Sequence, residues 1–183
     1  MQFMSHFYGE EGFVPYGTKH ISNMCTSLRS KTQENDMHDT LNYFSKIHEE
    51  EDPGLFVRVK MDNEERTQNL FWVDGAARKA YVAAYSDCVS FDTTFMTNCY
   101  NMPFAPFIGI NRHGQSFMLG CGFLRDEKET AFDWLFQVFL EAMGGKQHAC
   151  IITDQDGAMK NSIANIFPLS VHRNCRWHIM KNA

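Results

Sequence analysis

The chain has 183 residues, of which 44% are hydrophobic, and its formal net charge is −5. This size and apolar content suffice for one packed domain with an appendage, whereas the acidic balance argues against a free-standing DNA-binding module, which is typically basic. No apolar run approaches the ~20 residues of a membrane span, and no signal peptide is visible. The six cysteines form no Cys-x-x-Cys pair, which favours buried free thiols in a reducing compartment.

The first part of the chain predicts a helical and hairpin extension. Residues 1–54 are expected to hold a loop, a short helix near 19–29 and a helix over 36–50 with apolar residues at helical spacing. Residues 55–86 predict a hairpin and a short helix that lead into the core. The two strands and the helix are expected at 55–61, 67–73 and 75–85, with Asp74 as the helix cap.

Residues 87–183 predict an α/β core in which three meandering strands precede alternating helices and strands. This order implies a mixed sheet covered by helices. Asp126 and Glu129 are expected to form a capping pair for the first core helix, and Asp156 to cap the second. The strands are expected at 87–93, 104–111, 116–124, 149–153 and 169–171, and the helices at 129–143, at 156–167 and from Asn174 onward.

Two aspartates each close an apolar run. Asp92 follows Val89-Ser90-Phe91, and Asp154 follows Ile151-Ile152-Thr153. The two strands would lie side by side, so both carboxylates could share Mg²⁺ or Mn²⁺, which prefer oxygen ligands. Two-metal phosphoryl transfer is the chemistry of such a site, although each aspartate alone could serve as a turn former or a helix cap. The sequence singles out no third acid among the nearby candidates Glu127, Glu129 and Glu141.

A second group of candidate ligands lies between His172 and His178. Cys175 and His178 are three residues apart, so on a helix they share a face, and this spacing suits half of a tetrahedral zinc site. The alternative is a partly buried cysteine beside a surface histidine. The same stretch holds a basic and aromatic patch that could contact phosphates or could be a solvated helix face. The patch consists of Arg173, Arg176, Trp177, His178 and Lys181.

Five motifs that occur in order resemble the Mutator-like element (MULE) transposase domain. The motifs are Phe91-Asp92-Thr93-Thr94, Asn101-Met102-Pro103-Phe104-Ala105-Pro106-Phe107, Asn111-Arg112-His113-Gly114-Gln115, Ile152-Thr153-Asp154-Gln155-Asp156 and Cys175-Arg176-Trp177-His178. The resemblance is strongest to the plant far-red-impaired-response family, which derives from such transposases, and it covers roughly residues 35–183. It implies an RNase H-like fold in which Asp92 and Asp154 match the first two acids of a DDE triad.

The same resemblance implies a nuclear protein that binds DNA and regulates transcription, commonly in light signalling. The family's N-terminal zinc-binding domain and C-terminal SWIM-type zinc finger do not occur in these residues, so we expect a core that is truncated at its C-terminus. The leading hypothesis is a non-catalytic regulator that reaches DNA through segments outside this chain and contacts proteins. The alternatives are a Mg-dependent DDE transposase or nuclease that uses Asp92 and Asp154, and a scaffold or dimerisation fragment that forms homo-oligomers.

Overall fold

The computed structural model describes residues 36–94, 98 and 100–181. The chain divides into two compact units, Met1–Tyr43 and Phe44–Ala183. All the strands described below belong to the second unit. The helix predicted near 19–29 lies outside the described residues, so it stays a prediction. Within the described part of the chain, no helix is both long and apolar enough to span a bilayer.

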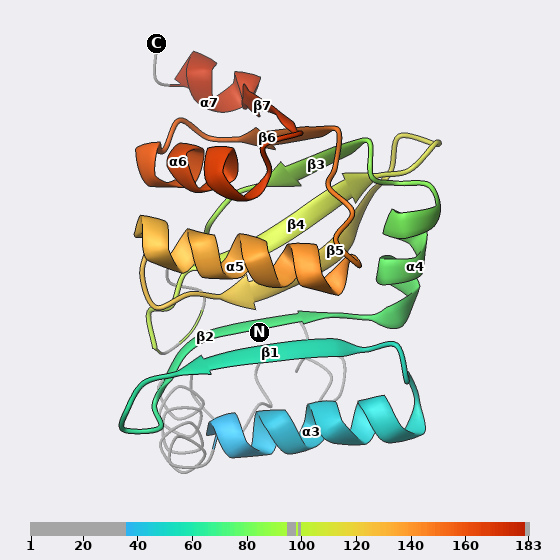
Figure 1. Cartoon of the computed structure of the whole chain (residues 1–183), viewed down its shortest axis with the longest axis vertical. Helices are drawn as coiled ribbons and strands as arrows, with labels where there is room; N and C mark the ends of the chain where they lie inside the picture. Colours follow the sequence, from blue (N-terminus) through green and yellow to red (C-terminus); the bar gives the residue numbers. More distant parts are fainter. Residues whose placement is uncertain (1–35, 95–97, 99, 182–183) are drawn as a thin grey trace, which may run out of the picture. The chain divides into compact units, whose positions relative to one another are not determined.

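A seven-stranded mixed sheet forms the centre of the second unit (Figure 1), with the strand order β1-β2-β5-β4-β3-β6-β7. Neighbouring strands from β1 to β3 are antiparallel, whereas β6 runs parallel to β3, and β7 runs parallel to β6. The predicted α/β class with a mixed sheet is therefore confirmed. The strands are β1 Phe56–Met61, β2 Thr67–Val73, β3 Cys88–Phe91, β4 Phe104–Ile110, β5 Ser116–Phe123, β6 Cys150–Thr153 and β7 Val171–Asn174.

The helices follow the predicted order, and their caps explain several of their ends. Asp74 begins α4 by accepting a hydrogen bond from the Ala77 N–H group at 2.6 Å, and Asp156 begins α6 by accepting one from the Met159 N–H group at 2.7 Å. Both caps confirm the sequence prediction. In the described part of the chain the helices are α3 Asp36–Glu50, α4 Gly75–Ala83, α5 Glu129–Ala142, α6 Gly157–Ile166 and α7 Arg176–Lys181.

Two local predictions were wrong. The capping pair of Asp126 and Glu129 does not form, because α5 has Lys128 at its N-cap and no side chain caps the helix. Instead, the Asp126 carboxylate accepts from the backbone N–H group of Lys128, and the Glu129 carboxylate accepts from the Asn161 amide at 3.1 Å. The last strand begins at Val171 rather than at residue 169, because the Leu169 N–H group donates to the Gln147 side chain before pairing with β6 begins.

A cluster of phenylalanine rings fills the core between the sheet and helices α4, α5 and α6. The Phe107 ring of β4 stacks on the Phe139 ring of α5, with 4.1 Å between the ring centroids, and lies 4.7 Å from the Phe91 ring of β3. Phe139 also contacts Tyr81 of α4, and Phe167, which follows α6, contacts the Phe136 and Phe139 rings of α5. This burial fixes β3 against the helices, so the residues that follow β3 leave the sheet at a defined position.

Candidate functional site

The carboxyl ends of β3 and β6 bring Asp92 and Asp154 to the same edge of the sheet. The two strands pair in parallel, with Ser90 opposite Ile152, and each aspartate lies two residues beyond its member of this pair. The prediction that these strands lie side by side is confirmed. Negative charge on Asp154 contributes to a raised pKa of the Asp92 carboxyl, so the two carboxylates interact electrostatically.

Asp92 is half-exposed, and two neighbouring groups oppose the rise of its pKa. Burial raises this pKa most, whereas the hydrogen bond donated by the Thr93 N–H group at 2.8 Å and the nearby His178 lower it. The imidazole Nε2 of His178 lies 3.6 Å from the Asp92 carboxylate, which makes an ion pair when the histidine is protonated. The structure therefore places His178 beside a predicted acid, a contact that the sequence pattern did not predict.

Glu127 is the candidate third acid that the structure brings to this edge. The Thr93 hydroxyl donates a hydrogen bond to its carboxylate. Burial raises the pKa of Glu127 most, and the charges of Asp156, Asp154 and Asp92 raise it further. We refer to Asp92, Asp154, Asp156 and Glu127 as the acidic edge.

The other two candidates for a third acid have different partners. Glu141 lies near the C-terminal end of α5 and pairs with Arg58 of β1, and Glu129 accepts from Asn161 of α6. No sequence signal distinguished Glu127 from these two acids, because only the path of the β5–α5 connection turns Glu127 towards the ends of β3 and β6.

Asp156 begins α6 as the sequence predicted, whereas the role of Asp154 as a site residue stays a prediction. The Asp156 carboxylate caps α6, and the backbone N–H group of Asp156 donates to the Asp154 carboxylate at 3.2 Å. The nearby His172 accepts from or donates to the Thr153 hydroxyl at 2.8 Å, and burial lowers its pKa. Asp154 therefore presents a half-buried carboxylate to the acidic edge while its neighbour holds the helix.

The predicted zinc half-site of Cys175 and His178 stays a prediction. The Cys175 N–H group donates to the Thr153 carbonyl, which continues the pairing of β7 with β6 into the start of α7. His178 then faces Asp92, and its Nδ1 atom is buried with no hydrogen-bond partner among the described residues. Next to it, the Lys181 ammonium lies 4.9 Å from the centre of the exposed Trp177 ring.

The acidic edge has the donor chemistry for Mg²⁺ or Mn²⁺, because its ligating atoms are carboxylate oxygens. Across residues 36–94, 98 and 100–181, no group of three or more histidine, cysteine, aspartate or glutamate side chains is placed to hold a metal ion together. The predicted Mg²⁺ or Mn²⁺ site therefore stays a prediction.

Comparison with known proteins assigns this core to a family. The MULE transposase domain model matches residues 88–182, which contain β3 to α7 and the whole acidic edge. Three relatives from Arabidopsis thaliana are similar along most of the chain. FAR1-RELATED SEQUENCE 5 is 35% identical over 95% of this chain, and FAR1-RELATED SEQUENCE 2 is 36% identical over 84%. FAR-RED IMPAIRED RESPONSE 1 is 36% identical over 81%.

The chain spans about a fifth of the length of these relatives, with 22%, 19% and 18% of their residues covered. The shared region reaches from the core into the segment that precedes it, since the longest of these matches covers 174 residues. The sequence resemblance is thereby confirmed, and the chain belongs to the MULE transposase domain family, with similarity to the FAR1-related proteins of plants.

Proposed function

We propose that this chain is the transposase-derived core of a nuclear protein that regulates transcription through DNA association and protein contacts, without catalysing strand transfer. The observation that carries the proposal is the family match over residues 88–182, combined with 30–39% identity to FAR1-related proteins. Those relatives are much longer than this chain, so we propose for it the role of one module in a larger regulator. The acidic composition favours protein contacts as a large part of the role of this module.

The strand arrangement supports an RNase H-like core within this proposal. The strands β5, β4 and β3 form an antiparallel meander, and β6 and β7 add to β3 in parallel. The hairpin of β1 and β2 extends the sheet beyond β5. This arrangement places the two strands that carry Asp92 and Asp154 next to each other, as such a core requires.

Contacts within the protein favour the non-catalytic hypothesis. The His178 imidazole lies beside the Asp92 carboxylate, and the Thr93 hydroxyl donates a hydrogen bond to the Glu127 carboxylate. These partners stabilise a negatively charged edge without any added cation, because they lower the pKa values of the two acids against the effect of burial.

A metal-dependent transposase or nuclease is the second candidate function. The observation that favours it is the electrostatic coupling among Asp92, Asp154 and Glu127, since carboxylates that interact in this way attract divalent cations. Asp92, Asp154 and Glu127 are then the residues on which activity would depend.

A metal titration followed by thermal unfolding separates the two functions. We expect Mg²⁺ and Mn²⁺ to change the melting temperature of the wild type no more than that of the Asp92→Ala/Asp154→Ala double variant. Saturable stabilisation of the wild type alone would support the metal-dependent candidate. DNA binding is measured in parallel by fluorescence anisotropy, and we expect Asp92→Ala to retain it. A chain that self-associates in sedimentation experiments and binds neither metal nor DNA would instead support the scaffold alternative.

A further inference from the structure

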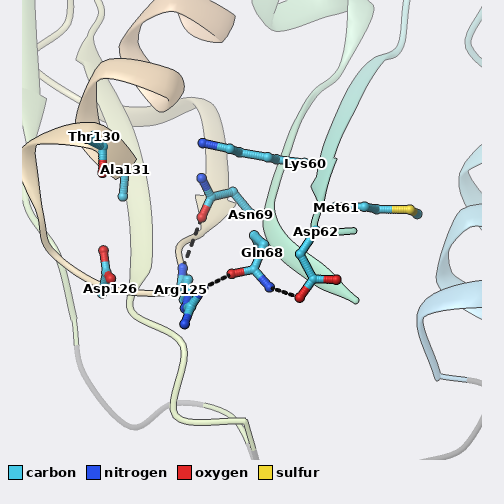
Figure 2. A pocket seen from close by; sticks show the side chains of 9 residues that line it. All are labelled: Lys60, Met61, Asp62, Gln68, Asn69, Arg125, Asp126, Thr130 and Ala131. Atoms are coloured by element: carbon cyan, nitrogen blue, oxygen red, sulfur yellow. Dashed lines mark hydrogen bonds between the residues drawn. The ribbon is translucent and has the colours of Figure 1, made fainter. Parts of the chain in front are cut away.

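A small cleft lies between the β1–β2 hairpin and the first turn of α5, away from the catalytic candidates. It has a volume of about 240 Å³, which suits a single small group better than a whole ligand. Figure 2 shows that polar side chains from three segments surround it. The polar residues that matter here are Lys60, Asp62, Gln68, Asn69, Arg125 and Asp126.

Asn69 is a buried amide with an unused donor. Its side chain is 2% exposed, and its Oδ1 atom accepts from the backbone N–H group of Arg125 at 3.0 Å. Among the hydrogen bonds of the described residues, none has the Asn69 Nδ2 group as donor. The Nδ2 atom is not among the buried polar atoms that lack a partner, so it is open to the cleft and can donate to an acceptor bound there.

Lys60 brings a positive charge to the same place. It is the cross-strand partner of Asn69, so both side chains lie on the same face of the hairpin, and a register shift between Lys60 and Met61 interrupts the strand there. In Figure 2 the ammonium end of Lys60 and the amide nitrogen of Asn69 point towards the same part of the cleft. Lys60 forms no ion pair within the described part of the chain.

The two carboxylates of the cleft already have cationic partners. Asp62 accepts from the Arg66 side chain at 2.8 Å and from the Gln68 amide at 3.0 Å, and hydrogen bonds from Arg66 hold its pKa below the usual value. Asp126 lies 3.5 Å from the Lys128 ammonium. Of the residues that line the cleft, Lys60 and Arg125 are the cations for which the described part of the chain supplies no carboxylate partner.

Two further features favour an anion in the cleft. The Arg125 guanidinium donates to the neutral Gln68 carbonyl at 2.6 Å, so its charge is held in place without being neutralised. The helix α5 begins at the cleft with no side-chain cap, and Thr130 and Ala131 of its first turn line the wall. A helix N-terminus carries partial positive charge, which disfavours nearby cations and favours an anion.

We propose that this cleft binds a backbone phosphate of DNA. The proposal rests on the DNA association proposed above and names one place where it occurs. A phosphate oxygen would accept from the Asn69 amide while Lys60 and Arg125 neutralise its charge, which is how proteins fix the register of a DNA strand. Arg125 lies two residues before Glu127, so the same β5–α5 connection contributes a residue to the cleft and a residue to the acidic edge.

DNA affinity at several salt concentrations tests the cleft. The variants are Lys60→Gln and Arg125→Gln, and the matched control is Lys79→Gln, which removes an exposed lysine on α4 outside the cleft. We expect each cleft variant to bind DNA roughly three- to tenfold more weakly at about 0.1 M salt, and to lower the salt-dependence slope by about one. We expect the control to lose less DNA affinity than either cleft variant. Arg125→Gln keeps the backbone hydrogen bond to Asn69, so this contact between the β5–α5 connection and β2 is retained.

A second readout uses inorganic phosphate and the side-chain amide resonance of Asn69. We expect phosphate to shift this resonance in the wild type, with chloride at equal ionic strength as the reference, and to shift it less in Lys60→Gln. Wild-type DNA binding that neither cleft variant weakens would overturn the cleft assignment and leave DNA association intact. A wild type that binds no DNA would overturn the cleft assignment and leave DNA association to segments outside this chain, and a phosphate response in that protein would identify the cleft as a site for free phosphate.

Discussion

The phenylalanine core under α5 and the acidic edge at the ends of β3 and β6 are built from the same two strands but have opposite energetics. Phe91 and Ile151 point into the core and are fully buried, whereas Asp92 and Asp154 follow only a few residues later and are partly exposed. Apolar burial in the core stabilises the folded state. The ionised acids of the edge destabilise it, because burial and like charges raise the pKa values of Asp92 and Glu127.

This contrast explains how the edge can exist in a stable protein. The Phe107 and Phe139 rings lock β4 to α5, and β4 in turn pairs with β3. The strands are therefore held in place by contacts that do not involve the carboxylates. We infer that changes in the core alter stability strongly, whereas changes at the edge alter mainly charge.

Removal of one central ring tests the core side of the comparison. We expect Phe107→Ala to lower the free energy of unfolding by about 3–5 kcal/mol, because it deletes a fully buried ring and leaves a cavity. Urea denaturation measures the change. The control is Ile110→Ala in the same strand, where the side chain is 52% exposed and the expected change is within about 0.5 kcal/mol. Similar effects of the two variants would contradict the assigned role of the ring cluster.

A pH series tests how a titratable group behaves inside the core. Burial lowers the pKa of His148 from 6.5 to about 4, and the ring contacts Phe167. The folded state therefore binds the proton less readily than the unfolded state. The stability that neutral His148 contributes is present above about pH 6.5 and is lost as the pH falls through about 4, with a total of about 3 kcal/mol.

Urea denaturation at several pH values in this window, for the wild type and for His148→Phe, measures the contribution of His148 as a difference. The control is His113→Gln, which changes an exposed histidine in the turn between β4 and β5. The raised pKa values of Asp92 and Glu127 act with the opposite sign, since their contribution is present at low pH and is lost as the pH rises through the folded values. A wild type and a His148→Phe variant with parallel pH profiles would rule out this role for His148.

Two substitutions at Asp156 test the edge and have the smallest expected effect on stability. Asp156→Ala removes the cap of α6, and we expect it to cost about 1 kcal/mol. Asp156→Ser keeps a capping oxygen but removes the charge that raises the pKa of Glu127. We therefore expect the serine variant to be the more stable of the two, with a lower Glu127 pKa in both. Denaturation curves and NMR titration of the Glu127 carboxyl give the two values, and an unchanged pKa would show that Asp156 does not belong to the acidic edge.

Several elements were predictable because their signals are local. Alternating apolar residues marked β1, a continuous apolar run marked β4, and single acids marked the starts of α4 and α6. The same logic failed at α5, where Asp126 and Glu129 have the spacing of a capping pair but bond elsewhere. The competing partners are a backbone group of the loop and a residue on α6, and a local pattern contains no information about the second.

The candidate site shows the same division. The positions of Asp92 and Asp154 after two neighbouring strands were predictable, because a polar residue at the end of a buried strand needs only the strand pattern and its order. His178 was predicted as a partner of Cys175. In the structure it lies beside Asp92, which comes 86 positions earlier in the chain (178 − 92). The parallel pairing of β7 with β6 carries α7 back over the strand ends, and this path produces the contact.

The sequence by itself determined the order of the strands and helices, the apolar faces that form the core and the two aspartates that follow β3 and β6. These properties depend on periodicity and on neighbouring residues. Only the tertiary structure decided which polar groups meet: Glu127 with the aspartates, His178 with Asp92, and Lys60 with Asn69 and Arg125. The physical reason is that electrostatic and hydrogen-bond energies depend on distance in space, and the folded path of the chain sets that distance.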